Sequence, residues 1–245
     1  MKSGFDHRVE ENSLFVCNYK DRMLKMTIKP CISNETPTIQ CGNFQSPVNI
    51  ETNYIDNMCD PGEMQLNYDN SFVSIENTGH TIKIYNDESG NAIINGRGFR
   101  LEEFHFHTPS EHVVNGHRYS MELHLVHQSQ VGRLAALSVF FELGCENPSF
   151  QVILDNLNKQ KNLVSGIEIN IDKLIPNRKT YYHYLGSLTT DPFIENVEWY
   201  VFSNPIEISL EQLENFKEYH PCNARELFDL NGRKILKKEY KNSIK

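Results

Sequence analysis

The sequence predicts a mixed fold dominated by β-strands, in a single domain with a few peripheral helices. Three observations lead to this prediction. Short β-like runs recur from Gln45 onward, turn-forming Asn and Gly residues separate them, and only two segments have helical signals. A length of 245 residues permits one large domain or two small ones, and an all-β domain can fill it alone.

Strands are predicted where apolar runs lie between turn signals. In chain order these runs are Phe72–Glu76, Thr81–Tyr85, Ala92–Ile94, Leu101–His107, Ser120–His127, Leu134–Leu143, Ile167–Ile171 and Val197–Phe202. Asn and Gly tolerate positive φ, so turns are expected at residues 86–90, 95–96, 115–116 and 231–232.

Helices are predicted over Pro148–Leu157 and Leu210–Glu218. The second segment follows Ser209, a good N-cap, and has Gln212 at its third helical position, which is the pattern of a capping box. Residues 1–40 are polar and irregular, and we predict that they form an N-terminal extension.

Composition and charge exclude several classes of function. Lys plus Arg (24) less Asp plus Glu (32) gives a net charge of −8, which argues against nucleic acid or an anionic membrane as the main partner. No apolar run approaches the roughly 18 residues that span a bilayer, and residues 1–20 lack the apolar stretch of a signal peptide. The six cysteines are scattered without a C-x-x-C pair, which argues against a cysteine-based zinc site. We therefore expect a cytoplasmic protein with mostly reduced thiols and no membrane insertion.

The sequence Phe104-His105-Phe106-His107 carries the most informative pattern. Side chains along a strand alternate between its faces, so both histidines should project from one face while both phenylalanines are buried on the other. Two imidazoles on one face of a sheet form a bidentate clamp for a metal ion.

A third histidine is predicted to join this pair. On the following strand Glu122, His124 and Val126 share one face, and a turn at residues 115–116 would let His124 face the pair. Isolated histidines are commonly core or surface residues, but a trio on two apolar strands favours a metal site. Three neutral imidazoles with an open fourth position are typical of catalytic rather than structural zinc.

The same residues allow a second kind of metal site. Gly98, His105, His107, Glu111 and Gly116 are spaced nearly as in the first metal motif of cupins, which bind iron or manganese. The two glycine spacings differ from that motif, and no Pro-x-Gly-x-x-His segment follows. Glu111 discriminates between the two sites, because it is a direct ligand in a cupin and does not touch the metal in the alternative.

Four separated blocks of the sequence resemble the α-class carbonic anhydrases, over about residues 40–235. The blocks are Gln45–Ile50, Phe104–His107 with Ser110–His112, Glu122–His127, and Gly186–Thr190. The continuation at residues 108–112 is more similar to bacterial members. The resemblance implies the α-carbonic anhydrase fold, in which a large, mostly antiparallel, twisted central sheet carries short peripheral helices, with residues 41–240 as the catalytic domain.

The implied activity is that of a lyase. It is the reversible hydration of CO₂ to bicarbonate and a proton through a zinc-bound hydroxide, with these small molecules as the only implied partners. Matched position by position, His105, His107 and His124 are the implied Zn²⁺ ligands. Thr189 is implied to accept a hydrogen bond from the hydroxide and to donate one to Glu111, which orients the hydroxide toward the substrate.

Further residues receive roles only through this resemblance. The walls of an apolar CO₂ pocket are implied to be Val126, Ala136, Leu188, Val197 and Trp199, with the N–H of Thr190 donating to bound substrate. His80 matches the proton-shuttle histidine, whose ordinary pKa near 6.5 suits proton transfer at neutral pH. The residues implied to support the ligands are Glu103 behind His105, Glu122 behind His124, and Asn223.

The chain also departs from the family pattern. Asn223 and Arg225 match part of a C-terminal pattern, but Glu226 and Phe228 replace the Pro and Gln that follow. Residues 1–40 lack a Trp-Gly-Tyr segment, and Phe193 stands where many secreted relatives have a cysteine.

A catalytically silent carbonic-anhydrase-like binding or adhesion protein is the main alternative. Such proteins typically lose one or more of the ligand histidines. This chain retains all three, together with Glu111 and Thr189, which favours the enzyme.

Overall fold

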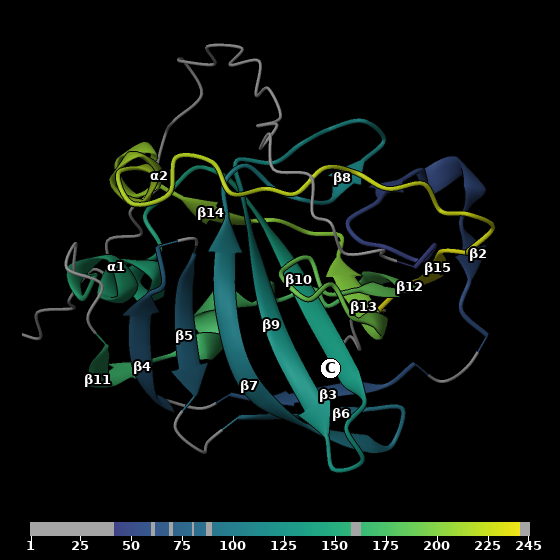
Figure 1. Ribbon diagram of the computed structural model, residues 1–245, viewed down its shortest axis with the longest axis horizontal. Coiled ribbons are helices and arrows are strands. Elements are labelled where there is room, and N and C mark those ends of the chain that lie inside the picture. Colours follow the sequence, from purple (N-terminus) through teal and green to yellow (C-terminus); the bar gives the residue numbers. More distant parts are fainter. Residues whose placement is uncertain are drawn as a thin grey trace, which may run out of the picture.

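One large twisted β-sheet runs through the computed structural model, which describes residues 42–59, 62–68, 71–79, 81–86, 90–157 and 163–240 (Figure 1). The strands within these ranges are β1 (Asn49–Ile50), β2 (Asp56–Asn57), β3 (Met64–Asn67), β4 (Ser71–Asn77), β5 (Ile82–Asn86), β6 (Asn91–Ile94), β7 (Arg97–His107), β8 (Val113–Val114), β9 (Met121–Ser129), β10 (Leu134–Leu143), β11 (Val164–Ile169), β12 (Tyr181–Ser187), β13 (Glu195–Phe202), β14 (Ile206–Ile208) and β15 (Leu236–Lys238). The helical elements are η1 (Thr52–Tyr54), α1 (Pro148–Asp155), η2 (Ile171–Leu174) and α2 (Leu210–Lys217). The predicted extension over residues 1–40 and the shuttle candidate His80 lie outside the described residues.

The order of the described strands across the large sheet is β11-β4-β5-β7-β9-β10-β13-β12-β15-β2, with β14 paired to β10 and with β6 paired to both β3 and β7. Neighbours are antiparallel except in the pairs β10–β13, β10–β14 and β15–β2, and β1 pairs with β8 in a small separate parallel sheet. Figure 1 shows β4, β5, β7, β9 and β10 side by side across the twisted sheet. The predicted β-dominated, mostly antiparallel architecture is confirmed.

Phenylalanines fill the face of the sheet that the two α-helices cover. The Phe106 ring on β7 contacts Phe150 of α1 and Phe216 of α2, with ring centroids 5.0 and 5.8 Å apart. Phe104, two residues earlier, belongs to the same buried cluster. Burying one such side chain contributes about 1.5–3 kcal/mol, so these contacts fix β7 with its phenylalanines toward the helices. The residues between them must then point to the other face.

A β-bulge in β7 sets this alternation. Leu101 pairs with His127 of β9, but Glu103 pairs with the next residue along, Val126, so Glu102 is an extra residue in the ladder. An extra residue reverses the in–out pattern. Leu101 and Phe104 therefore both reach the phenylalanine-rich core, although an unbroken strand would place them on opposite faces.

Most predicted elements are present, with shifted ends. The first helix ends at Asp155 rather than Leu157, and α2 has the predicted capping box between Ser209 and Gln212. The strand predicted over Ile167–Ile171 is wrong at its end, because β11 stops at Ile169 and Ile171 begins a 3-10 segment. The sequence analysis missed several short strands and also β12, which is one of the longer central strands.

The cysteines and helices bear on the predictions of reduced thiols, no membrane insertion and a cytoplasmic location. Cys59 and Cys145 form no disulfide, as expected for mostly reduced thiols, whereas Cys222 is disulfide-bonded and departs from that expectation. Among the described residues, no helix is both long enough and apolar enough to cross a membrane. A cytoplasmic location stays a prediction.

Candidate active site

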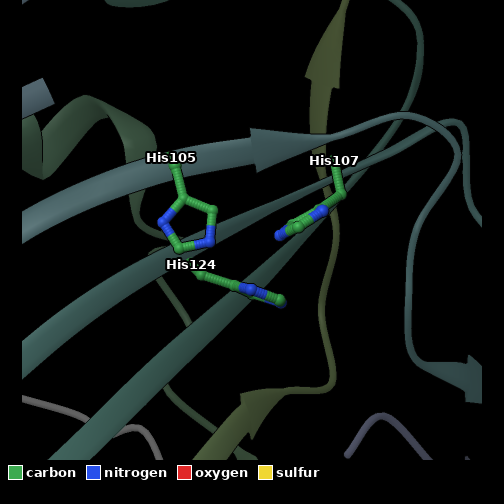
Figure 2. A group of neighbouring side chains, drawn as sticks. All are labelled: His105, His107 and His124. Atoms are coloured by element: carbon green, nitrogen blue, oxygen red, sulfur yellow. The ribbon is translucent and has the colours of Figure 1, made fainter. Parts of the chain in front are cut away.

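Three histidines meet on the face of the sheet opposite the phenylalanines. His105 and His107 lie on β7, and His124 lies directly across from His105 in the ladder between β7 and β9. The ring centroids are 4.6 to 5.3 Å apart, and one nitrogen from each ring lies within 4.8 Å of the others. All three side chains are buried, with relative exposures of 3%, 2% and 1%. Figure 2 shows the rings, two from one strand and one from its neighbour, turned toward a common space.

One nitrogen of each imidazole is held by an oxygen of a neighbouring residue. The distances are 3.0 Å from His105 Nδ1 to a Glu103 carboxylate oxygen, 3.2 Å from His107 Nδ1 to the Asn223 carbonyl oxygen, and 2.9 Å from His124 Nε2 to Glu122 Oε1. These oxygens accept, so each of these nitrogens carries a proton and donates it. The opposite nitrogen of each ring is then an unprotonated donor of a lone pair. For His105 and His107 this atom is Nε2, which is buried and has no hydrogen-bond partner among the described residues.

This donor set fits a zinc ion. Buried polar atoms without partners are rare, and three lone pairs that face one space have no obvious purpose without a cation. Zinc takes imidazole nitrogens at about 2.0–2.1 Å, so one ion between the rings could reach all three. A second cluster, His112 with Glu122 and His124, does not fit a metal in the same way, because its atoms already bond to one another, at 2.6 Å between His112 Nδ1 and Glu122 Oε1.

Burial keeps two of the rings neutral, which metal binding requires. Burial is the largest cause that lowers the pKa of His107 to about 3, and the nearby His105 lowers it further. Burial likewise lowers the pKa of His124 to about 4, although Glu122 acts in the opposite direction. Both rings are therefore unprotonated at neutral pH.

Glu122 is the anchor of the site. Its Oε2 accepts the backbone N–H groups of Glu111 and His112, each at 2.7 Å. Its Oε1 accepts from His112 Nδ1, from His124 Nε2 and from the Ser138 hydroxyl. Burial alone would raise the pKa of Glu122, but these partners, led by His112 and His124, lower it well below its ordinary value. Glu122 therefore stays ionised and fixes the orientation of the His124 ring.

Sequence reasoning assigned no role to the residues that extend this network. Beyond Glu122, His112 Nε2 lies 2.7 Å from the Tyr184 hydroxyl, which lies 2.7 Å from Ser46 Oγ. His112 and Ser46 both belong to the blocks that carry the family resemblance, so the signal was present. Tyr184 lies on β12, the strand that the sequence analysis missed.

Glu111 lies beside the histidines but does not replace one of them. Its Oε1 accepts the backbone N–H of Arg225 at 2.8 Å, and it lies 3.3 Å from His107 Nδ1, the nitrogen that faces away from the common space. Burial raises the pKa of Glu111, whereas His124 and the side chain of Thr189 lower it. Thr189 is itself buried, in the segment after β12. The three histidines are thus a complete donor set without Glu111, which disfavours the cupin arrangement.

A cavity of about 100 Å³ opens next to the histidines. Its lining includes four of the predicted walls of the CO₂ pocket, Val126, Ala136, Leu188 and Trp199, together with Thr189 and Thr190. Val197, the fifth predicted wall residue, is buried in the same apolar cluster as Ala136 and Trp199 but is not among the residues that line the cavity, so its role stays a prediction. Lys83 and Asp191 line the polar side together with Glu103, and the sequence analysis had not placed the first two there.

Comparison with known proteins agrees with this geometry. Residues 33–241 match the family described as eukaryotic-type carbonic anhydrase. A carbonic anhydrase of Klebsiella pneumoniae is 34% identical over 210 residues, covering 84% of each chain, and one of a Nostoc species is 35% identical, covering 84% of this chain and 80% of that one. The solved α-carbonic anhydrase of Thermovibrio ammonificans, in complex with sulfanilamide, superposes with a TM-score of 0.76 at 37% identity, covering 80% of this chain and 87% of that one. The chain therefore belongs to the eukaryotic-type carbonic anhydrase family, whose members are lyases that hydrate CO₂.

Proposed function

We propose that this chain interconverts CO₂ and bicarbonate with a zinc ion held by His105 Nε2, His107 Nε2 and His124 Nδ1. One observation carries the assignment of the ligands. In each ring one nitrogen is occupied by an oxygen acceptor, and the other nitrogen faces the same buried space. A set of ordinary core histidines would have both nitrogens satisfied.

The bound ion would supply Lewis acidity that makes a water molecule acidic near neutral pH. The protein's part is to hold the ligand rings in one tautomer and to keep them neutral. Glu103, Glu122 and the Asn223 carbonyl perform the first task, and the burial of His107 and His124 performs the second.

Thr189 and Glu111 would orient the nucleophile. Glu111 is an acceptor whose Oε1 is already occupied by the Arg225 N–H, so Oε2 is free to accept from Thr189. A hydroxyl group that donates its own proton to Glu111 can only accept from the pocket side. Thr189 would thus accept a hydrogen bond only from a group that carries a proton, and this bond would orient that group toward the substrate.

The cavity walls match a small, uncharged substrate. CO₂ has no net charge, and Val126, Ala136, Leu188 and Trp199 present apolar surface to it. Bicarbonate would meet the N–H of Thr190 at the polar side. Release of the second product, the proton, is assigned to His80, a proposal that rests on the family resemblance.

The test combines metal analysis with a hydration assay. We expect close to one zinc per chain and CO₂-dependent proton release, and we expect His107→Ala to lose both. His117→Ala is the matched control, because His117 is an exposed histidine in the β7–β9 connection and should change neither. Zinc-loaded, folded protein without hydration activity would favour the binding protein, and iron or manganese in place of zinc would favour the cupin chemistry.

A further inference from the structure

Arg225 lies between two aromatic rings at the edge of the site. Its guanidinium carbon is 4.0 Å from the centroid of Phe193 and 4.3 Å from that of Phe228. The same guanidinium donates through Nη1 to Gln45 Oε1 at 2.9 Å and to the Ser46 carbonyl at 2.7 Å. One side chain therefore ties together three segments that are far apart in the sequence.

The Phe193 ring belongs to the loop that carries Thr189. The Leu188 N–H donates to the Ile194 carbonyl and the Phe193 N–H to the Thr190 carbonyl, each at 2.9 Å, which closes residues 188–194 into a compact loop. Phe193 has φ of 57°, in the left-handed region that bulky residues avoid. A backbone held there needs a compensating contact, and the stacked guanidinium provides one.

The backbone of Arg225 acts on the partner of Thr189. Its N–H donates to Glu111 Oε1 at 2.8 Å, and the side chain of Thr189, in the loop, lowers the pKa of the same carboxyl group. The side chain of Arg225 thus holds the loop, and its main chain holds Glu111. Arg225 therefore fixes the positions of both Thr189 and Glu111, the two residues that must interact in the proposed reaction.

We infer that Phe193, Arg225 and Phe228 form a clamp that keeps the side chain of Thr189 aligned with the carboxylate of Glu111. Arg225 is the positioning residue of this clamp. The clamp itself does not depend on the proposed function; only the catalytic purpose of this alignment rests on it. Lysine cannot replace arginine in the clamp, because a planar guanidinium is needed to stack on two rings and to donate in its own plane.

Arg233 offers a matched control. It also lies over two aromatic rings, Phe44 and Tyr184, and donates to main-chain carbonyls, including those of Gln45 and Leu185. These contacts lie outside residues 188–194. A general loss of stability should therefore appear in both arginine variants, and a loss of loop positioning only in one.

The first experiment measures amide hydrogen exchange in zinc-free protein, so it does not depend on activity. In Arg225→Gln we expect the amides of Leu188 and Phe193 to exchange at least about tenfold faster than in the wild type, with Arg233→Gln unchanged there. Phe193→Gly should also exchange faster, although glycine relieves the left-handed backbone. Unchanged loop exchange in folded Arg225→Gln, or in Phe193→Leu if Arg225→Gln does not fold, overturns the clamp.

The second experiment measures kcat/KM for CO₂ hydration at equal zinc content. We expect Arg225→Gln and Arg225→Lys to lose roughly 10- to 100-fold, as a small displacement of a catalytic group can cause, and Phe193→Tyr to retain activity because it keeps the ring. Faster loop exchange with unchanged kcat/KM overturns the positioning role. If the zinc-loaded wild type itself has no hydration activity while the exchange result holds, the proposed function fails but the clamp is still supported.

Discussion

The two faces of β9 each carry a fully enclosed histidine, and the two residues differ in what their nitrogens do. Burial lowers the pKa of both His124 and His127 to about 4, so neither charge state nor exposure separates them. On the core face, His127 Nδ1 donates to the Leu125 carbonyl at 3.0 Å and Nε2 lies 2.6 Å from the Tyr68 hydroxyl. On the site face, His124 donates through Nε2 to Glu122, and among the described residues its Nδ1 makes no hydrogen bond but lies 3.8 Å from Glu111 Oε2, in the cluster with His105 and His107.

This difference identifies a ligand by its unused lone pair rather than by burial. His127 has found two partners within the fold, so it contributes to stability and offers nothing to an ion. Within the described part of the chain, His124 has one hydrogen-bond partner, and its second nitrogen is left for a bound group. The same criterion separates the trio from the cluster of His112, Glu122 and His124, whose atoms already bond to one another.

The largest effects are expected when the ring of His124 or of His127 is removed, one at a time. His124→Ala should lower zinc affinity by more than the roughly 10- to 100-fold expected for loss of a mere supporting group, and should abolish hydration. His127→Ala should keep the metal but cost about 2–4 kcal/mol of unfolding free energy, because it leaves a cavity and unpaired polar groups. Zinc competition against a chelator and urea unfolding of the zinc-free proteins measure both effects. Equal zinc loss in the two variants would contradict the distinction.

A second effect is expected at Glu122, which anchors the site face. Glu122→Gln replaces one acceptor oxygen by an NH₂ group that faces donors, so buried N–H and O–H groups lose their partner. We expect a loss of about 3–5 kcal/mol in the unfolding free energy of the zinc-free protein. Glu142→Gln, on an exposed position of β10, is the control and should stay within about 0.5 kcal/mol of the wild type. Equal stability of the two variants would show that Glu122 is not the anchor.

Much of the site could be predicted because its information is local. Alternation along β7 and β9 separates histidine from phenylalanine, and two neighbouring strands suffice to bring His105 opposite His124. The bulge at Glu102 was not visible in this pattern, yet it lies upstream of the histidines and leaves their alternation intact.

The rest depends on contacts between distant segments. Arg225 reaches Gln45 across 180 positions, and Lys83 reaches the cavity because β5 pairs with β7. No local periodicity encodes such contacts. Val197 shows a related limit, since a matched position in a strand does not say whether a side chain lines a cavity or fills the core beside it.

The smallest predicted effect is the pH dependence that His127 alone confers. Its pKa is about 4 in the folded protein and near 6.5 in the unfolded chain, so between these values only the unfolded chain gains the proton. The unfolding free energy contributed by this residue is therefore complete above pH 6.5 and falls as the pH drops toward 4. The expected slope is about 1 kcal/mol per pH unit.

Zinc-free wild type and zinc-free His127→Gln isolate this slope, because His107 and His124 titrate alike in both and cancel in the difference. Urea unfolding between pH 7.5 and about 5 should show the two stabilities converging below pH 6.5 and running parallel above it. Parallel curves over the whole range would mean that the core-face histidine is not held neutral by its burial. The two faces of β9 would then differ in charge as well as in hydrogen bonding, and the lone pair would no longer be the single property that separates a ligand from a core residue.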